Sequence, residues 1–149
     1  MTDPAIVLPR VGEGVRLAAR ILALVMAIAT AGLLLGMADV TVGTSLFLLL
    51  ALAWCVSPYA AIALALRKPW SSTEAILVAF ATTIAVSGLA LYVYTVAFFV
   101  KPDPQGGLVL LFIPLWQWGV ALVGLGVAWL MERRASGKGD ATLSPDQGR

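Results

Sequence analysis

The chain contains no histidine and a single cysteine, Cys55. The missing histidines remove the commonest transition-metal ligand and the usual ligand of haem iron. A thiol–disulfide relay needs at least two cysteines, so Cys55, which lies within an apolar run, is interpreted as a small buried side chain. We therefore expect neither a metal site nor a cofactor.

Charged side chains are also scarce, at 12% of the chain against 60% hydrophobic residues. Apolar runs occupy residues 16–37, 45–66, 75–100 and 108–131, with no charge after Arg20 in the first and none in the others. Roughly 20 helical residues cross a hydrocarbon core about 30 Å thick. Because these helices lack the polar face of a soluble bundle, the sequence predicts an all-α, integral membrane four-helix bundle. The short connections favour an up-down arrangement in which consecutive helices are antiparallel neighbours.

The positive charges fall almost entirely on one side of these runs. Only Lys101 lies in the two connections on the other side, and the remaining Lys and Arg residues are Arg10, Arg16, Arg20, Arg67, Lys68, Arg133, Arg134, Lys138 and Arg149. Positive charge near helix ends marks the cytoplasmic side of a membrane. We expect both termini in the cytoplasm, and the basic residues near anionic lipid rather than nucleic acid.

The two ends of the chain contain no recognisable domain. Residues 1–14, with Pro4 and Pro9, are predicted to be an irregular cytoplasmic leader, and residues 132–149 a disordered cytoplasmic tail. Residues 15–131 form the transmembrane domain. Arg16 and Arg20, the apolar stretch and Gly36-Met37-Ala38 also resemble a cleavable signal peptide, but an uncleaved first span is favoured because the leader and the stretch are long.

Catalytic groups are missing at membrane depth. Proton relays and ion-coupled transporters depend on ionisable residues inside the membrane, and the runs have none at depth. An enzyme would have to take its acid or base from Asp39, Glu74 or Asp103 in the connections. We therefore expect no catalytic residues and no enzymatic activity.

Gln117 is the most polar side chain expected near the membrane midplane, at a depth similar to Cys55 and Ser87. An unpaired amide in hydrocarbon would cost several kcal/mol, so it should face protein. Ser57, Thr83 and Ser87 are the expected partners. The simplest interpretation is a hydrogen bond between helices, and the alternative is that Gln117 lines a binding pocket.

Residues 101–118 contain the strongest suggestion of such a pocket. Pro114 cannot donate a backbone hydrogen bond and clashes with the carbonyl of Leu110, which predicts a kink in the last helix. An aromatic, mildly polar cavity between the second, third and fourth helices is predicted from the neighbouring residues Trp54, Ser57, Ser87, Tyr92, Thr95, Pro114, Trp116, Gln117 and Trp118. Interfacial aromatic belts and core packing are the competing explanation.

Small residues recur at helical spacing in three places. Gly32 and Gly36 form a GxxxG motif, which lets another helix approach closely, either in a homodimer or within the chain. The other two series are Ala75, Ala79, Thr83 and Ser87 in the third run and Gly124 and Ala128 in the fourth. Residues 71–74 also have a capping-box pattern, with Ser71 as the cap of the third helix.

These features favour a non-catalytic accessory or interaction subunit that acts through helix–helix contacts. Its expected partners are the lipid bilayer and another membrane protein or a second copy of itself. The alternative is a binder or facilitator of a neutral lipophilic or aromatic molecule. A high content of Ala, Gly and Arg favours the inner membrane of a bacterium.

Overall fold

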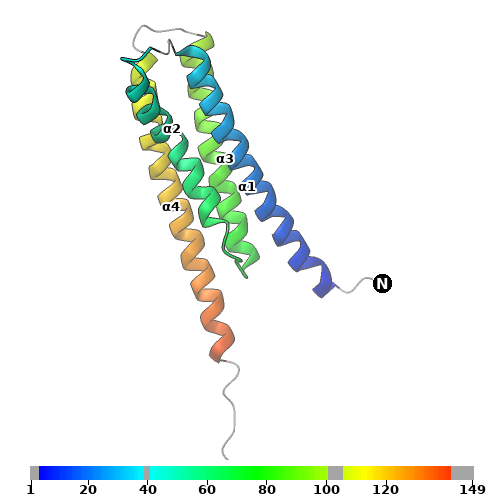
Figure 1. Ribbon diagram of the computed structural model, residues 1–149. Coiled ribbons are helices and arrows are strands. Elements are labelled where there is room, and N and C mark those ends of the chain that lie inside the picture. Colours follow the sequence, from blue (N-terminus) through cyan, green and yellow to red (C-terminus); the bar gives the residue numbers. More distant parts are fainter. Residues whose placement is uncertain (1–3, 39–40, 101–105, 142–149) are drawn as a thin grey trace, which may run out of the picture.

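The structure, a computed structural model, describes residues 4–38, 41–100 and 106–141, and the side chains of residues 12–38, 41–100 and 108–137. It is all-helical over these residues (Figure 1). The elements are α1 (Pro4–Met37), α2 (Ser45–Ala65), α3 (Thr73–Thr95), the π-helical turn η1 (Val96–Val100) and α4 (Gly106–Ala141).

Four helices are long and apolar enough to cross a membrane, as the sequence predicts. The qualifying segments are Gly12–Met37, Ser45–Ala65, Thr73–Val100 and Leu108–Gly137. The third run is less regular than expected, because its last five residues form the π-helical turn η1 and not a continuation of α3.

The leader and the tail differ from the sequence prediction. Residues 4–14, expected to be irregular, belong to α1, and residues 132–141, expected to be disordered, belong to α4. Pro4 is compatible with a helix start because the first helical N–H groups have no intrahelical partner. At the other end, Glu132, Arg133 and Ala135 are good helix formers that extend α4 beyond the other helices (Figure 1). Residues 1–3 and 142–149 lie outside the described part of the chain.

The helices pack mainly in four pairs: α1 with α2, α1 with α3, α2 with α4, and α3 with α4. The expectation that all consecutive helices are neighbours is therefore wrong for α2 and α3, which make few contacts with each other. The connection after Ala65 is long enough to take the chain across the bundle. Trp70 in this connection packs against the core and donates a hydrogen bond from Nε1 to the carbonyl of Ala65 at 3.2 Å.

Many small and polar residues lie inside the bundle, and many large aliphatic residues lie on its surface. Ala19, Ala79 and Ala90 are fully buried, whereas Ile28 is 72% exposed. In water such a surface would be an aggregation hazard, but lipid tails are as apolar as these side chains. Small interior residues let the helix backbones approach closely, and close packing replaces the hydrophobic effect as the main attraction between helices.

A close approach of this kind joins α3 and α4. A Cβ atom added to Gly124 would overlap Thr82 Oγ1 and lie 2.8 Å from Thr82 Cβ, so a larger residue would require Thr82 or the helix to move. Ala128 is fully buried one turn further along α4. The predicted small-residue series of α3 is buried over its whole length, from Ala75 to Ser87.

A carboxylate of α4 caps the start of α3. Glu132 accepts hydrogen bonds from the backbone N–H groups of Ser71 at 2.7 Å and Ser72 at 2.9 Å, and from the Ser71 hydroxyl. The N-cap is Ser72, whose hydroxyl accepts from the N–H of Ala75 at 3.4 Å, so the expected Ser71 cap is displaced by one residue. In a capping box Glu74 would accept a backbone hydrogen bond from the cap residue. Here Glu132 does so instead, because it accepts from the N–H groups of Ser71 and Ser72 just before the helix.

Candidate functional site

Gln117 lies at the centre of the bundle and is completely buried. Its side-chain amide Nε2 donates to the hydroxyl of Tyr59 at 2.8 Å and to the backbone carbonyl of Val86 at 3.2 Å. These two bonds connect α4 to α2 and to α3. The expected burial of Gln117 against protein is therefore present in the structure.

The partners expected for Gln117 are wrong. The Thr83 hydroxyl donates to the carbonyl of Ala79 at 2.8 Å, and the Ser57 hydroxyl donates to the carbonyl of Trp54 at 2.8 Å. Short hydroxyl side chains in helices commonly bond back to a carbonyl of their own helix, and here that bond uses the single proton that each of these two hydroxyls could have donated to Gln117. Tyr59 carries its hydroxyl on a long side chain and reaches the amide from α2.

Several other polar groups surround this pair. The side chain of Thr30 on α1 contacts Tyr59, and the hydroxyl of Tyr94 on α3 lies near both Tyr59 and the Cys55 thiol. We call Thr30, Cys55, Tyr59, Ser87, Tyr94 and Gln117 the core polar cluster. Each of the four helices contributes to it, and every member is buried. None is charged at neutral pH in its usual state, so the cluster suits a neutral ligand or none.

Three buried polar atoms of the core polar cluster have no hydrogen-bond partner among the described residues. They are the Ser87 hydroxyl, the Tyr94 hydroxyl and Gln117 Oε1. Buried polar atoms are normally paired, since an unpaired one loses its hydrogen bonds to water without replacement. The two hydroxyls can each donate a hydrogen bond, and the amide oxygen can accept one.

Pro114 affects the same region through the backbone. It cannot donate to the carbonyl of Leu110, and the Cys55 thiol donates to that carbonyl instead, at 3.4 Å. Trp54 Nε1 donates to the next carbonyl, Leu111, at 3.1 Å. The sequence thus correctly located the Leu110 carbonyl as an acceptor without its helical donor. In the structure α2 supplies the donor, the Cys55 thiol.

The nine residues predicted to line a cavity between α2, α3 and α4 do not converge. Tyr92 is 70% exposed and Trp116 is 66% exposed, and Thr95 is exposed as well, whereas Gln117 is enclosed. Ser87 and Pro114 are buried, and Trp54, Ser57 and Trp118 form a separate group in which Trp118 Nε1 donates to the Ser57 hydroxyl at 2.9 Å. Helical spacing alone did not show which face of α3 and α4 points inward.

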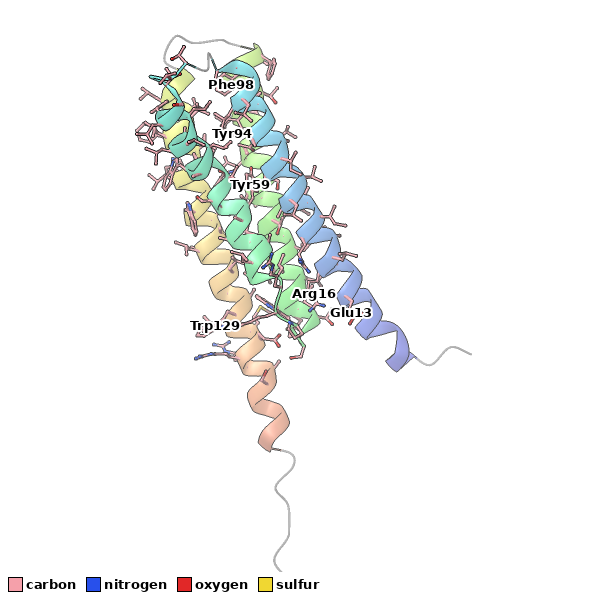
Figure 2. All side chains as sticks on the ribbon, in the orientation of Figure 1. Glu13, Arg16, Tyr59, Tyr94, Phe98 and Trp129 are labelled. Atoms are coloured by element: carbon pink, nitrogen blue, oxygen red, sulfur yellow. The ribbon has the colours of Figure 1, made fainter. Side chains whose placement is uncertain are left out.

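The structure instead contains an apolar cavity of about 360 Å³ between α1, α2, η1 and α4. We call it the end cavity. Its walls are Leu33, Leu34, Met37, Ala38, Thr44, Phe47, Leu48, Ala51, Phe98 and Leu110. Figure 2 shows Phe98, Tyr94 and Tyr59 in that order from this end toward the middle of the bundle, with Arg16 and Trp129 near the opposite end.

The GxxxG motif of α1 does not pack within the chain. Gly32 and Gly36 are exposed, and a Cβ atom added to either would have no neighbour within 4 Å among the described residues. The intrachain explanation of this motif is therefore wrong. The inward-facing side of the same segment is formed by Thr30 and Leu34, which are buried.

Tyr59 and Glu132 are the interacting residues that sequence reasoning missed. Tyr59 follows Cys55 by four residues, a spacing that places both on one helix face, and this spacing could have indicated that Tyr59 faces the core. Glu132 is the first acidic residue after the last apolar run, and a carboxylate there can reach a neighbouring helix start.

No protein-family model matches the chain, and searches of curated proteins and of solved structures find no similar protein. Among the described residues there is no group of three or more side chains that could hold a metal ion. Function is therefore inferred from the geometry of the chain itself.

Proposed function

We propose that this protein is a non-catalytic accessory subunit that binds another membrane protein, or a second copy of itself, through the Gly32–Gly36 face of α1. One observation carries the proposal. Of the three small-residue series, those of α3 and α4 pack within the bundle, whereas Gly32 and Gly36 have open space around them in the part of the chain that the structure describes. A GxxxG surface gains most from a second helix, because only backbone-to-backbone approach brings its atoms into contact.

The proposal includes a membrane topology. The protein is an up-down bundle in the inner membrane of a bacterium, with both termini in the cytoplasm. Contacts at one end support it, since Arg16 of α1 donates to the carbonyl of Lys68 at 3.3 Å and Glu132 of α4 holds Ser71 and Ser72. The start of α1, the α2–α3 connection and the end of α4 therefore share one end, which is also rich in Lys and Arg.

Native mass spectrometry of gently extracted protein tests the interaction. We expect a complex of defined mass in the wild type and at least about tenfold less of it in the variant Gly32→Ile with Gly36→Ile, because the branched side chains separate the helices. The matched control is Gly88→Ile, at an exposed glycine of α3 that also has no neighbour within 4 Å. A complex of unchanged abundance in the double variant, or a wild-type protein without any partner, contradicts the proposal.

A further inference from the structure

Arg20 is the last charged residue of α1. It lies within Gly12–Met37, the part of α1 that is long and apolar enough to cross a membrane. The helix from Arg20 to Met37 spans roughly 26 Å at about 1.5 Å per residue, close to the thickness of a hydrocarbon core. The backbone of Arg20 therefore lies near the edge of that core, from which its long side chain can reach the layer of lipid phosphates.

The guanidinium of Arg20 has no partner in the described part of the chain. It forms no hydrogen bond or ion pair with the described residues, and its Nε is buried. The side chain as a whole is only partly buried, and its two terminal nitrogens are not enclosed, so they can donate to a ligand. A guanidinium that is partly withdrawn from water without a counter-ion is unfavourable, and a bound anion removes that penalty.

Arg16 lies one turn before Arg20 on the same face of α1. Residues four apart in a helix have Cβ atoms about 6 Å apart, so both guanidinium groups can donate to one phosphate. Nη1 of Arg16 donates to the carbonyl of Lys68 at 3.3 Å, which holds this side chain beside the α2–α3 connection. Arg67 and Lys68 are exposed in that connection and add two further positive charges.

Acidic residues do not neutralise this group of cations. Glu13 is exposed one turn before Arg16 (Figure 2), and it forms no ion pair with the described residues. Glu132 is occupied by Ser71 and Ser72. A ligand with net negative charge is therefore favoured over a zwitterionic headgroup, which would bring its own ammonium group to the site.

Apolar surface continues from Arg20 toward the middle of the membrane. Leu24 is 50% exposed and Ile28 is 72% exposed, and both follow Arg20 at four-residue spacing along one side of α1. An acyl chain attached to a phosphate at Arg20 would lie along these side chains. A free phosphate ion would make no use of them, so the site fits a phospholipid.

We propose that Arg16 and Arg20 together bind the phosphate of an anionic phospholipid, with an acyl chain along Leu24 and Ile28. The site lies several turns before Gly32 on α1. It does not depend on association through the Gly32–Gly36 face, so either proposal can fail without the other.

Native mass spectrometry of the full-length protein in a non-ionic detergent tests the site. The protein is titrated with phosphatidylglycerol or with phosphatidylcholine of the same acyl chains, and the bound lipids are counted. We expect phosphatidylglycerol to bind at least about tenfold more tightly. Millimolar glycerol 3-phosphate, which has the phosphate without acyl chains, should leave the bound phosphatidylglycerol in place.

Variants of one charge separate the site from general attraction. Arg20→Gln should weaken phosphatidylglycerol binding about tenfold and leave phosphatidylcholine binding unchanged, whereas Arg20→Lys, which keeps the charge, should lose less. The matched control Arg133→Gln removes the same charge at the same end of the bundle. Arg133 already stacks on Trp129, with Cζ 3.7 Å from the ring centroid, so its loss should change binding less than about twofold. Circular dichroism checks that each variant keeps its helicity.

Equal affinity of the wild type for the two lipids would overturn the proposal without recourse to any variant. Equal losses in Arg20→Gln and Arg133→Gln would also overturn it, since net charge alone would then account for binding. Displacement of phosphatidylglycerol by glycerol 3-phosphate would show a site for small anions and not for a lipid.

Discussion

Glycine serves different purposes on the outer face of α1 and at the interface between α3 and α4. At Gly124 the missing side chain is filled by Thr82 of the neighbouring helix, so the glycine is part of the fold. At Gly32 and Gly36 no described residue of this chain occupies the corresponding space. Small residues therefore indicate close helix approach in general, and only the surrounding helices show whether that approach serves folding or association.

The largest difference in stability is expected when an isoleucine is placed at the α3–α4 interface and, separately, on the outer face of α1. Gly124→Ile should destabilise the bundle by about 3 kcal/mol, because the new side chain overlaps Thr82 and the two helices must separate. Gly32→Ile, in open space, should leave the stability of the isolated chain unchanged. Unfolding by sodium dodecyl sulfate, followed by circular dichroism, measures both, and similar stability of the two variants would remove the distinction.

A smaller effect is expected at the end of the α3–α4 interface. Glu132→Gln replaces a carboxylate that accepts three hydrogen bonds by an amide that can turn a donor toward Ser71 and Ser72. Hydrogen exchange of the Ser71 and Ser72 amides should become about tenfold faster, which corresponds to about 1.4 kcal/mol. Glu74→Gln, in the exposed first turn of α3, is the control. Equal exchange rates in the two variants would show that Glu132 does not hold the connection.

The smallest effect is expected at the centre of the bundle. A double-mutant cycle of Gln117→Leu and Tyr59→Phe should give a coupling free energy of about 0.6 kcal/mol, the average for hydrogen bonds between membrane helices. Unfolding of the two single variants and the double variant supplies the cycle. Gln117 also donates to the Val86 carbonyl. If that bond persists in Tyr59→Phe, this single substitution should change the free energy of unfolding only slightly. Purely additive changes would mean that this bond contributes nothing to stability.

The sequence predicted the helices well and their contacts poorly. The four apolar runs locate the membrane-spanning segments, since each must satisfy its own backbone hydrogen bonds in lipid. Gln117 was correctly expected to face protein, and Pro114 to free a carbonyl. The inward faces of α3 and α4 were not predictable, because helices that are apolar all round have no polar stripe to mark the outside.

At the candidate site, too, the sequence indicated the depth of residues along the helices but not the direction in which they point. Tyr92 and Trp116 were grouped with Gln117 because they share its depth, yet they point out of the bundle. Tyr59 and Tyr94 are the tyrosines that face the core, and their roles depend on the neighbouring helices. The end cavity was not foreseen, since its wall combines residues from four elements that have no common sequence pattern.

Composition and the spacing of charge by themselves determined that this chain is helical and carries four segments able to cross a membrane, because hydrocarbon excludes charge and unpaired backbone. The tertiary structure decided which small residues are covered, which polar side chain Gln117 bonds and where the end cavity lies. Those outcomes depend on how the helices rotate and approach one another, and side-chain shape decides this once hydrophobicity no longer distinguishes one face of a helix from another.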